Sequence, residues 1–582
     1  MKKRHPLIPL LALMMGSGSL HAQLYWNATG PGPHDWSDTA NWVDDTDEPT
    51  APLAPVESRK IYFGASPGAT AANSYTVRLD AEGGSQTLEG GMVFSGNASG
   101  SGTTVTMDLN DQSLILNGGE LGWWREAATQ YGGNTIRFEG GGTLRVGAVL
   151  AASIDLGRRY ASFSTANQTT NNTLVVGAGT TFDTANTSNI WVAANGENFH
   201  HNYTLDLQAA TLRSGSQADT LKVANTIGAG VALATATNGN SSKNGVIRLG
   251  NLSLLEIGND LILGQSNENK TGYSYGGTYQ GELVFSPTQG TTPVTVRIGR
   301  DLRLGVEENS TGVISTPEVM HLSVGSAETR GGKILVGHRA IVKTVAAERD
   351  AVGSLVAKGG SFNAYIEELS VGFNANTHET EGESTAGTAT GTLDFSSAEL
   401  GVLDISGSAR VGVGREAVGT LLLAGGEARS ASLTVGNASL TAARSTLGLD
   451  ETLWSVSGDF LLGELGDVHI SLGSQPAGLE VEGSFLIADG GVMTVDFSSL
   501  GGEGFLWALK LAGEQQSLLE GYLLDGQLAG TGEYASLATV VQDGGYTYYG
   551  IAAIPEPGTY VLLFGGTLLG LAFGRKGKGE RG

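Results

Sequence analysis

One short pattern returns along most of this chain: an apolar residue, any residue, a β-branched or leucine residue, and then glycine. The clear copies begin at Leu144, Leu174, Leu255, Leu261, Val296, Leu302, Leu322, Ile334, Leu369, Ala409, Leu433 and Phe460, and a decayed copy begins at Phe485. Alternation with a period of two places the first and third residues on one face of a strand. The glycine that follows permits the positive φ of a tight corner. The pattern therefore predicts a strand followed by a corner, repeated many times.

The spacing of the copies indicates how these strands are arranged. The last four copies begin at 409, 433, 460 and 485, which are 24, 27 and 25 residues apart. Such a spacing is close to one coil of a parallel β-helix, which buries apolar side chains against the neighbouring coils. The six residues from 255 to 261 predict successive strands of one coil, and longer gaps predict loops or lost copies. An array of β-sandwiches stays open, although hairpin dipeptides rarely follow the repeat strands.

The composition fits many short strands and excludes several classes of site. Glycine accounts for 89 of the 582 residues, and the chain has no cysteine. Disulfides, thiol catalysis and cysteine-based zinc sites are therefore impossible. The net charge of −24 predicts that nucleic acid is not a partner, because phosphate backbones are repelled. The simplest interpretation of the excess of acidic residues is that it keeps an exported protein soluble.

The N-terminus carries the features of an export signal. Lys2, Lys3 and Arg4 precede an apolar run over residues 7–15, and small residues follow it. This order is typical of a secretory signal peptide, here residues 1–22, with cleavage after Ala22 and before Gln23. We expect signal peptidase to act at that bond.

A tryptophan-rich segment follows. Trp26, Trp36 and Trp42 precede the first apolar strands, and we expect residues 23–120 to contain a cap and the first strands of the solenoid. The open end of a solenoid needs such a cover, since it would otherwise expose apolar faces and strand edges. A sugar-stacking platform is the functional alternative for these rings. The segment resembles the opening of autotransporter passengers, but the chain ends in one apolar segment rather than the many strands of a membrane barrel.

The C-terminal tail, residues 554–582, combines three signals. Pro555, Glu556 and Pro557 hold the chain extended before an apolar run from Tyr560 to Phe573. That run predicts a single short transmembrane helix, at the lower limit of what crosses a bilayer. The basic residues after it, Arg575, Lys576 and Lys578, would stay in the cytoplasm.

This tail resembles the sorting signal of the PEP-CTERM proteins of Gram-negative bacteria. The resemblance rests on Pro555–Pro557, the apolar run and the basic end, about one twentieth of the chain. It implies recognition by an exosortase, transient anchoring in the inner membrane and transfer to the outer envelope or beyond. An ordinary tail anchor is the alternative, and it too would place the body outside the cytoplasm.

The remaining motifs do not form a recognisable catalytic site. His338, after a repeat copy, is interpreted as a surface histidine, and His200 with His201 as part of a loop that lacks a third metal ligand. Gly272–Gly276 matches Gly-x-Ser-x-Gly, but no strand and helix flank it as a nucleophile elbow requires. We therefore predict no catalytic residue, metal or cofactor.

Together these features predict an all-β chain, a parallel β-helix with an N-terminal cap and a C-terminal transmembrane helix. Residues 121–550 would hold the degenerate solenoid repeats. The predicted function is that of an exported, non-enzymatic structural or adhesion protein of the cell surface or extracellular matrix. A polysaccharide-binding or polysaccharide-degrading β-helix with the same tail is the alternative, and extracellular polysaccharide is then a further partner.

Overall fold

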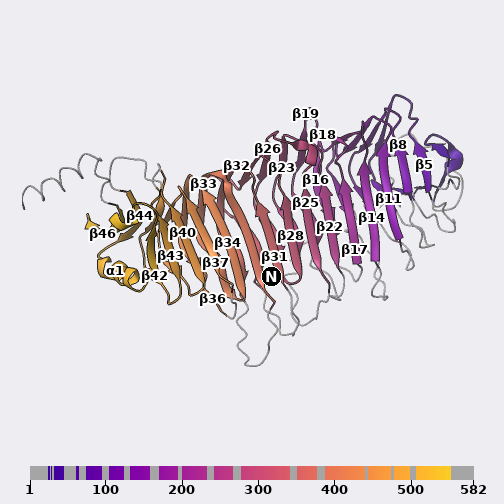
Figure 1. Ribbon diagram of the computed structural model, residues 1–582. Helices are drawn as coiled ribbons and strands as arrows, with labels where there is room; N and C mark the ends of the chain where they lie inside the picture. The colour runs from indigo at the N-terminus through magenta and orange to yellow at the C-terminus, as the bar shows by residue number, and fades with distance from the viewer. Residues whose placement is uncertain are drawn as a thin grey trace, which may run out of the picture. The chain divides into compact units, whose positions relative to one another are not determined.

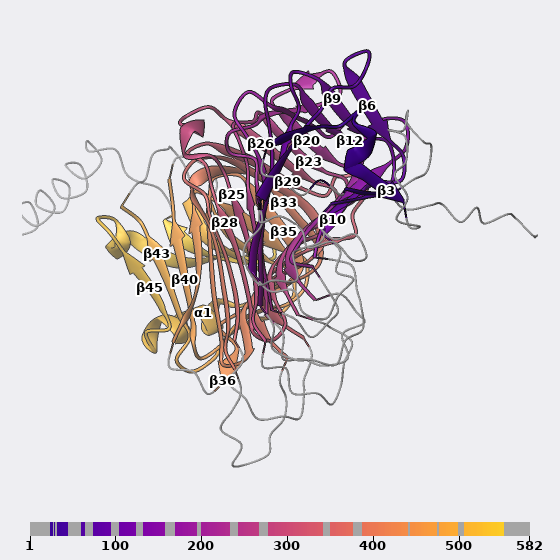
Figure 2. The same ribbon diagram turned by 90° about the vertical axis from the view of Figure 1, so that its right-hand side faces the viewer.

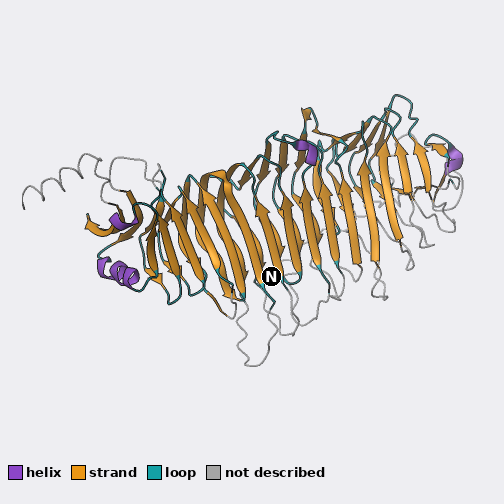
Figure 3. Ribbon diagram, viewed as in Figure 1, coloured by secondary structure: helices purple, strands orange, loops and turns teal. Residues whose placement is uncertain are grey.

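The computed structural model describes residues 24–26, 28, 32–44, 60–63, 74–94, 104–123, 132–157, 169–194, 200–232, 242–266, 277–340, 350–375, 387–439, 443–473, 477–498 and 506–551. These residues are dominated by strands, which Figure 3 draws in orange. The chain divides into two compact units. Unit 1 comprises Met1–Ala193 with Phe199–Ala224, and unit 2 comprises Ala194–Asn198 with Asn225–Gly582.

Unit 1 is built from coils of three strands each, such as β4, β5 and β6. Strands one coil apart pair in parallel and form three columns. The first column holds β1 (Leu24–Trp26), β4 (Ile61–Phe63), β7 (Met92–Phe94), β10 (Glu120–Trp123), β13 (Ala152–Leu156) and β16 (Thr187–Val192). The second holds β2 (Pro33–Asp35), β5 (Ser74–Arg78), β8 (Thr104–Asp108), β11 (Gly132–Glu139), β14 (Thr169–Val176) and β17 (His200–Asp206). Figure 1 shows β5, β8, β11, β14 and β17 in this order.

The third column of unit 1 is a separate sheet, part of which Figure 2 shows with β6, β9 and β12. It holds β6 (Ser85–Leu88), β9 (Ser113–Leu116), β12 (Thr143–Val146), β15 (Thr181–Asp183) and β18 (Thr211–Ser214), to which β19 (Gln217–Ala218) adds antiparallel. β3 (Trp42–Asp44) pairs antiparallel with β1 after a short helix, η1 (Thr39–Asn41), and β20 (Thr220–Val223) ends the unit.

Unit 2 repeats the three-column arrangement with longer strands. One column holds β23 (Leu254–Ile257), β26 (Val294–Ile298), β29 (Met320–Val324), β38 (Leu453–Val456), β41 (Gly478–Val481) and β44 (Leu506–Ala512). The next holds β21 (Thr226–Val231), β24 (Leu261–Gln265), β27 (Leu302–Val306), β30 (Gly332–Arg339), β39 (Phe460–Leu462) and β42 (Phe485–Ile487). Three long strands turn a corner and join columns: β32 (Gly360–Asn374), β33 (Ala389–Arg415) and β35 (Glu427–Val435). The short β36 (Ala438–Ser439) pairs with the end of β33.

The third column of unit 2 contains β22 (Lys243–Arg248), β25 (Tyr279–Val284), β28 (Ser310–Ser315), β31 (Ala351–Val356), β34 (Ala417–Ala424), β37 (Ser445–Asp450), β40 (Gly466–Ser471), β43 (Val492–Asp496) and β45 (Leu528–Thr531). A short helix, η2 (Pro287–Gln289), lies between β25 and β26. The last coil carries α1 (Gln516–Leu524), η3 (Ala535–Leu537), β46 (Ala538–Asp543) and β47 (Tyr546–Ile551). β47 pairs antiparallel with both β44 and β46.

The register confirms that the repeat copies mark successive coils. In unit 2 the first residues of eight copies follow one another as parallel partners: Leu261, Leu302, Ile334, Leu369, Ala409, Leu433, Phe460 and Phe485. Leu255, Val296 and Leu322 form a second series, and β23 and β24 are successive strands of one coil. The all-β prediction is confirmed, and within each unit this parallel pairing is that of a β-helix. The predicted transmembrane helix lies outside the described residues.

Two facing columns of glycine bring backbones together inside unit 2. Gly305 ends a repeat copy with a φ of 60°, as expected for a corner, and a Cβ there would collide with the carbonyl oxygen of Val352. Gly312 belongs to the facing column, and a Cβ there would collide with the carbonyl oxygen of Leu263. The glycine of the repeat is therefore required for close packing as well as for its backbone conformation.

The three N-terminal tryptophans form a buried aromatic cluster in unit 1. Trp26, Trp36 and Trp42 are each at most 5% exposed. The ring centroids of Trp26 and Trp42 are 4.7 Å apart, and those of Trp36 and Trp42 are 5.0 Å apart. Because other rings cover these faces, the sugar-platform alternative is wrong for these side chains. Their burial is what a cap requires, while the boundaries of residues 1–22, 23–120, 121–550 and 554–582 remain predictions.

Candidate functional site

The predicted processing residues lie outside the part of the chain that the structure describes. Ala22 and Gln23 come before its first residue, and Pro555, Glu556, Pro557, Arg575, Lys576 and Lys578 come after its last. Their roles therefore remain predictions. The last strand, β47, ends at Ile551, so only residues 552–554 separate the folded body from Pro555.

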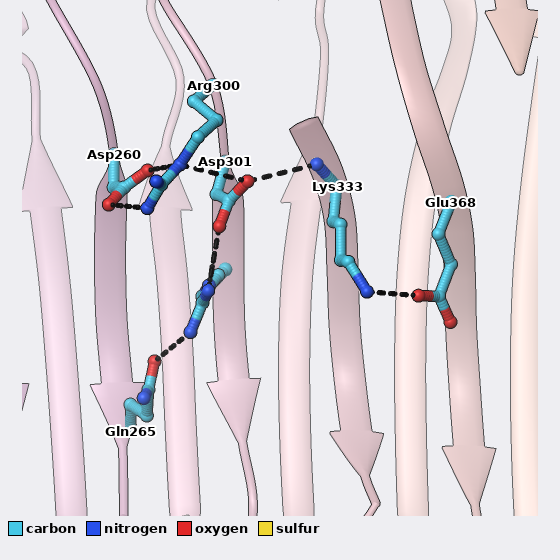
Figure 4. A network of polar contacts seen from close by, with 7 residues as sticks. Asp260, Gln265, Arg300, Asp301, Lys333 and Glu368 are labelled. Atoms are coloured by element: carbon cyan, nitrogen blue, oxygen red, sulfur yellow. Dashed lines mark hydrogen bonds and ion pairs between the residues drawn. The ribbon is translucent and has the colours of Figure 1, made fainter. Parts of the chain in front are cut away.

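A polar cluster crosses several coils of unit 2 (Figure 4). It begins where Arg300 binds Asp260 through two hydrogen bonds, of 2.9 and 2.7 Å. Asp301 lies 3.6 Å from Arg300 and accepts a hydrogen bond of 2.7 Å from Arg303. Since Asp260 and Asp301 directly precede the paired residues Leu261 and Leu302, their carboxylates occupy adjacent coils, and Arg300 offsets their repulsion.

The cluster continues over the next coils with opposite charges in contact. The ammonium group of Lys333 lies 2.9 Å from one carboxylate oxygen of Glu368, and Arg410 lies 2.8 Å from the other. Burial alone would raise the pKa of Glu368, but the hydrogen bond from Lys333 and the charges of Lys333 and Arg410 lower it below its ordinary value. We call these residues the charge ladder: Asp260, Arg300, Asp301, Arg303, Lys333, Glu368 and Arg410. Each of its carboxylates is bound by a cation, so the arrangement holds coils together.

His338 lies beside the charge ladder and is buried, so its interpretation as a surface histidine is wrong. It is 6% exposed, its Nδ1 lies 2.9 Å from the hydroxyl of Ser370, and its ring stacks on Phe373 with centroids 4.9 Å apart. Burial lowers the pKa of His338 to about 4, and the charge of Glu368, which raises it, is opposed by neighbouring cations that lower it further. The imidazole is therefore neutral at pH 7. The sequence missed this because residue 338 follows a corner glycine, which shifts the alternation of inward and outward residues.

Arg339, the next residue in the chain, binds two partners at the same corner of unit 2. Arg339 and Glu308 are both 4% exposed at their side chains and approach to 3.3 Å. Arg339 also donates a hydrogen bond of 3.0 Å to the carbonyl oxygen of Gly387, and so does the side-chain amide of Asn374. A buried ion pair of this kind fixes the geometry of its surroundings, since removal of one partner leaves an unpaired buried charge.

The interpretation of His200 and His201 as a loop is also wrong. Both belong to β17, and His201 is buried with its Nδ1 2.9 Å from the hydroxyl of Tyr203. Among the described residues, no three His, Asp or Glu side chains are grouped so that they could hold a metal ion.

The outer face of the second column in unit 1 carries a feature that the sequence did not reveal. Ser74, Thr104, Thr135, Thr173 and Thr204 are successive parallel partners on β5, β8, β11, β14 and β17. We call them the hydroxyl column. Within the described part of the chain, the four threonine hydroxyls make no hydrogen bond, so each can donate to and accept from a ligand.

A search of the described residues for membrane-spanning helices gives a negative result: none combines the length and the apolar character that a bilayer requires.

Comparison with known proteins identifies the tail. The family model described as the PEP-CTERM protein-sorting motif matches residues 553–576. No curated protein and no solved structure matches the chain. The motif is the recognition tag for exosortase processing and implies an exported precursor that is anchored in a membrane. The chain thus carries a PEP-CTERM sorting signal directly behind a β-helical body.

Proposed function

We propose that the chain is a non-enzymatic structural protein whose mature form lies at the outer envelope or in the extracellular matrix. The observation that carries this proposal is the sorting motif at residues 553–576, separated by one residue from a folded β-strand that ends at Ile551. An exported β-helix presents long strand faces to its surroundings, which suits a structural or adhesive role.

The polar clusters support the non-enzymatic part of the proposal. The charge ladder pairs its carboxylates with cations, and Glu308 with Arg339 does the same in a buried corner. Catalytic acids and bases, in contrast, must be within reach of a substrate. The stacking of coils is thus a sufficient role for the charged residues of these two clusters.

The sorting role can be tested by replacing Pro555, Glu556 and Pro557 with alanine. We expect a precursor that stays in the membrane fraction, because exosortase no longer recognises it. The matched control replaces Pro317 and Glu318, an equivalent dipeptide in the body, and should reach the outer envelope normally. Cell fractionation with mass spectrometry of both ends reports the outcome. Normal delivery of the tail variant would refute the assignment.

Polysaccharide binding is a second candidate function, and the hydroxyl column favours it. Its five side chains are uncharged and lie one coil apart, about 4.8 Å, so they match a linear polymer that carries hydroxyls at regular intervals. The positions two residues further on hold Thr76, Thr106, Arg137, Val175 and Asp206. Because this second row is mixed, the hydroxyls form a single regular row, which suits a linear polymer.

Four Thr→Val substitutions in the hydroxyl column, at 104, 135, 173 and 204, remove the hydroxyls and keep the side-chain shape. We expect weaker retention of the protein in gels that contain a soluble neutral glucan. A control with Thr143, Thr181 and Thr211 changed to Val removes hydroxyls from the other sheet of unit 1. Equal retention of both variants and the unchanged protein would exclude this site and leave the sorting proposal unaffected.

A further inference from the structure

At the C-terminal end of unit 2, the outer edge of β46 has no hydrogen-bonding partner among the residues that the structure describes. β47 lies between β44 and β46, so β46 is the outermost strand of this small antiparallel sheet. Gly544 and Gly545 join β46 to β47 with φ angles of 57° and 86°, as in a tight type I′ hairpin. Asp543 and Tyr546, which flank the turn, then exchange hydrogen bonds, and the pairs alternate along the strands. The backbone groups of Val540 and Gln542 consequently point away from β47.

Another strand edge at the same end of unit 2 is covered by side chains. At the last strand of the middle column, the hydroxyl of Tyr522 accepts a hydrogen bond of 3.1 Å from the amide of Ile487. Gln527 donates a hydrogen bond of 2.7 Å to the carbonyl oxygen of Ala488. Among the described residues, no group bonds the backbone of Val540 or Gln542.

The sequence of β46 also lacks the features that normally protect an edge. The strand reads Ala-Thr-Val-Val-Gln-Asp, with no proline, no lysine and no bulge, and each of its residues is at least partly exposed. Natural edge strands usually carry such features, because a bare edge pairs with another strand. Leu537, directly before the strand, is 36% exposed and adds apolar surface.

We propose that β46 pairs edge to edge with β46 of a second copy of this chain, in antiparallel orientation. Among the registers that align the outward backbone groups, two form the most hydrogen bonds, one centred on Val540 and one on Val541. In the first, Val540 faces Val540, Gln542 faces Ala538 and Asp543 faces Leu537. In the second, Val541 faces Val541 and Asp543 faces Thr539. Neither register opposes two acidic side chains, whereas a parallel pairing in register would place Asp543 beside Asp543.

The pairing joins β44, β47 and β46 of each copy into six consecutive antiparallel strands with twofold symmetry, the commonest symmetry of soluble oligomers. It adds about four backbone hydrogen bonds, because the amide of Ala538 already bonds the carbonyl oxygen of Ala535. Six residues a side bury much less than the roughly 1,000 Å² of a stable interface, so the contact is weak in dilute solution. Two copies held by the same membrane or matrix have a high effective concentration, which favours it. The inference concerns self-association and does not depend on the ligand of the mature protein.

Cysteine cross-linking offers a direct test, because the chain contains no cysteine. The full chain, purified in mild detergent, would carry Val540→Cys, Val541→Cys or, as the control, Thr539→Cys. A residue that faces its own counterpart has a Cα separation of about 4.5–5.5 Å, within the range of a disulfide. We expect oxidation to give a disulfide-linked dimer of the Val540 or the Val541 variant at least fivefold more efficiently than of the Thr539 variant, which faces its own counterpart in neither register.

A second substitution distinguishes edge pairing from cross-linking by chance collisions between molecules. Val540→Pro removes an outward amide without breaking a hydrogen bond to β47, so β46 stays in place while its edge is blocked. Added to Val541→Cys, it should reduce the dimer at least fivefold while the thermal unfolding midpoint is unchanged. Equal cross-linking at all three positions, or cross-linking that survives the proline, overturns the proposal. So does slow amide exchange at Val540 in a protein that shows no dimer, since another segment or a different partner then covers the edge.

Discussion

At the scale of single residues, the corner glycines and His338 show that the backbone of unit 2 determines which side chains fit and which are buried. The repeat predicts a corner at the glycine after each strand, and Gly264, Gly305, Gly337 and Gly372 form one with φ angles of 57–64°. Gly258 and Gly299 occupy the same place in the pattern and have no positive φ. The second requirement, room for a facing backbone, depends on a strand from another coil and could not be predicted locally.

Replacement of Gly305 by alanine tests that second requirement. The new Cβ meets both an unfavourable φ and the carbonyl oxygen of Val352, so we expect a loss of about 3 kcal/mol or more in the free energy of unfolding. Gly290→Ala is the matched control, because its φ is 56° and nothing lies within 4 Å of the added atom. It should cost about 1–2 kcal/mol. Urea unfolding followed by circular dichroism measures both, and equal losses would mean that the close contact is unimportant.

His338 gives a pH dependence with a definite sign. Its pKa is about 4 in the folded chain and 6.5 in an unfolded one, so the unfolded state binds the proton more readily. The stabilisation is complete above pH 6.5 and is lost as the pH falls through 4, by about 3 kcal/mol in total. His338→Gln is neutral throughout, so urea unfolding at pH 7 and pH 4 should show a larger acid loss for the unchanged protein. Parallel acid losses would show that His338 is protonated without penalty.

At the scale of strands and columns, the sequence predicted the coils but not the surfaces that they create. The spacing of the copies beginning at Ala409, Leu433 and Phe460 is nearly constant, and the register follows it. The sequence alone does not predict the hydroxyl column, because its residues are 30, 31, 38 and 31 positions apart, with loops of different length between them. The charge ladder could not be predicted for the same reason. A surface column depends on the register between coils, which irregular loops conceal.

The helix α1 shows a different limit. Residues up to Ala512 continue β44, Gly513 follows with a φ of 78°, and α1 begins at Gln516. The helix replaces a strand in the last coil, and its Tyr522 packs against Phe485 with ring centroids 6.1 Å apart. The start of the helix is thus set by the need to cover the end of a column as well as by the helix propensity of its residues.

The charge ladder predicts unequal roles for two similar ion pairs. Glu368→Gln leaves Lys333 and Arg410 without their carboxylate at a partly buried site, so we expect a loss of about 1–2 kcal/mol in the free energy of unfolding. Glu318→Gln is the control: Glu318 and Lys358 are also 2.9 Å apart, but both side chains are more than half exposed. That change should cost less than about 0.5 kcal/mol. Similar losses for the two variants would show that the ladder contributes no more than a surface pair.

At the scale of the whole molecule, the exported chain must remain folded without any disulfide. Its 58 acidic residues exceed its 34 basic ones, and this excess keeps it soluble but also makes the folded state repel itself. The stability of each unit therefore rests on packed coils, with paired charges such as those of Arg339 and Glu308 placed where water is excluded.

Salt should consequently stabilise this protein, although salt weakens individual surface ion pairs. Raising NaCl from about 0.01 M to about 0.15 M shortens the screening length from about 30 Å to about 8 Å. Repulsion among surface carboxylates then falls, whereas the pairs of the charge ladder, which are short and whose carboxylates are mostly buried, are screened less. We expect the thermal unfolding midpoint to rise by a few degrees, and sorbitol at matched osmolality controls for non-ionic effects. A falling midpoint would mean that exposed ion pairs outweigh the net charge of −24.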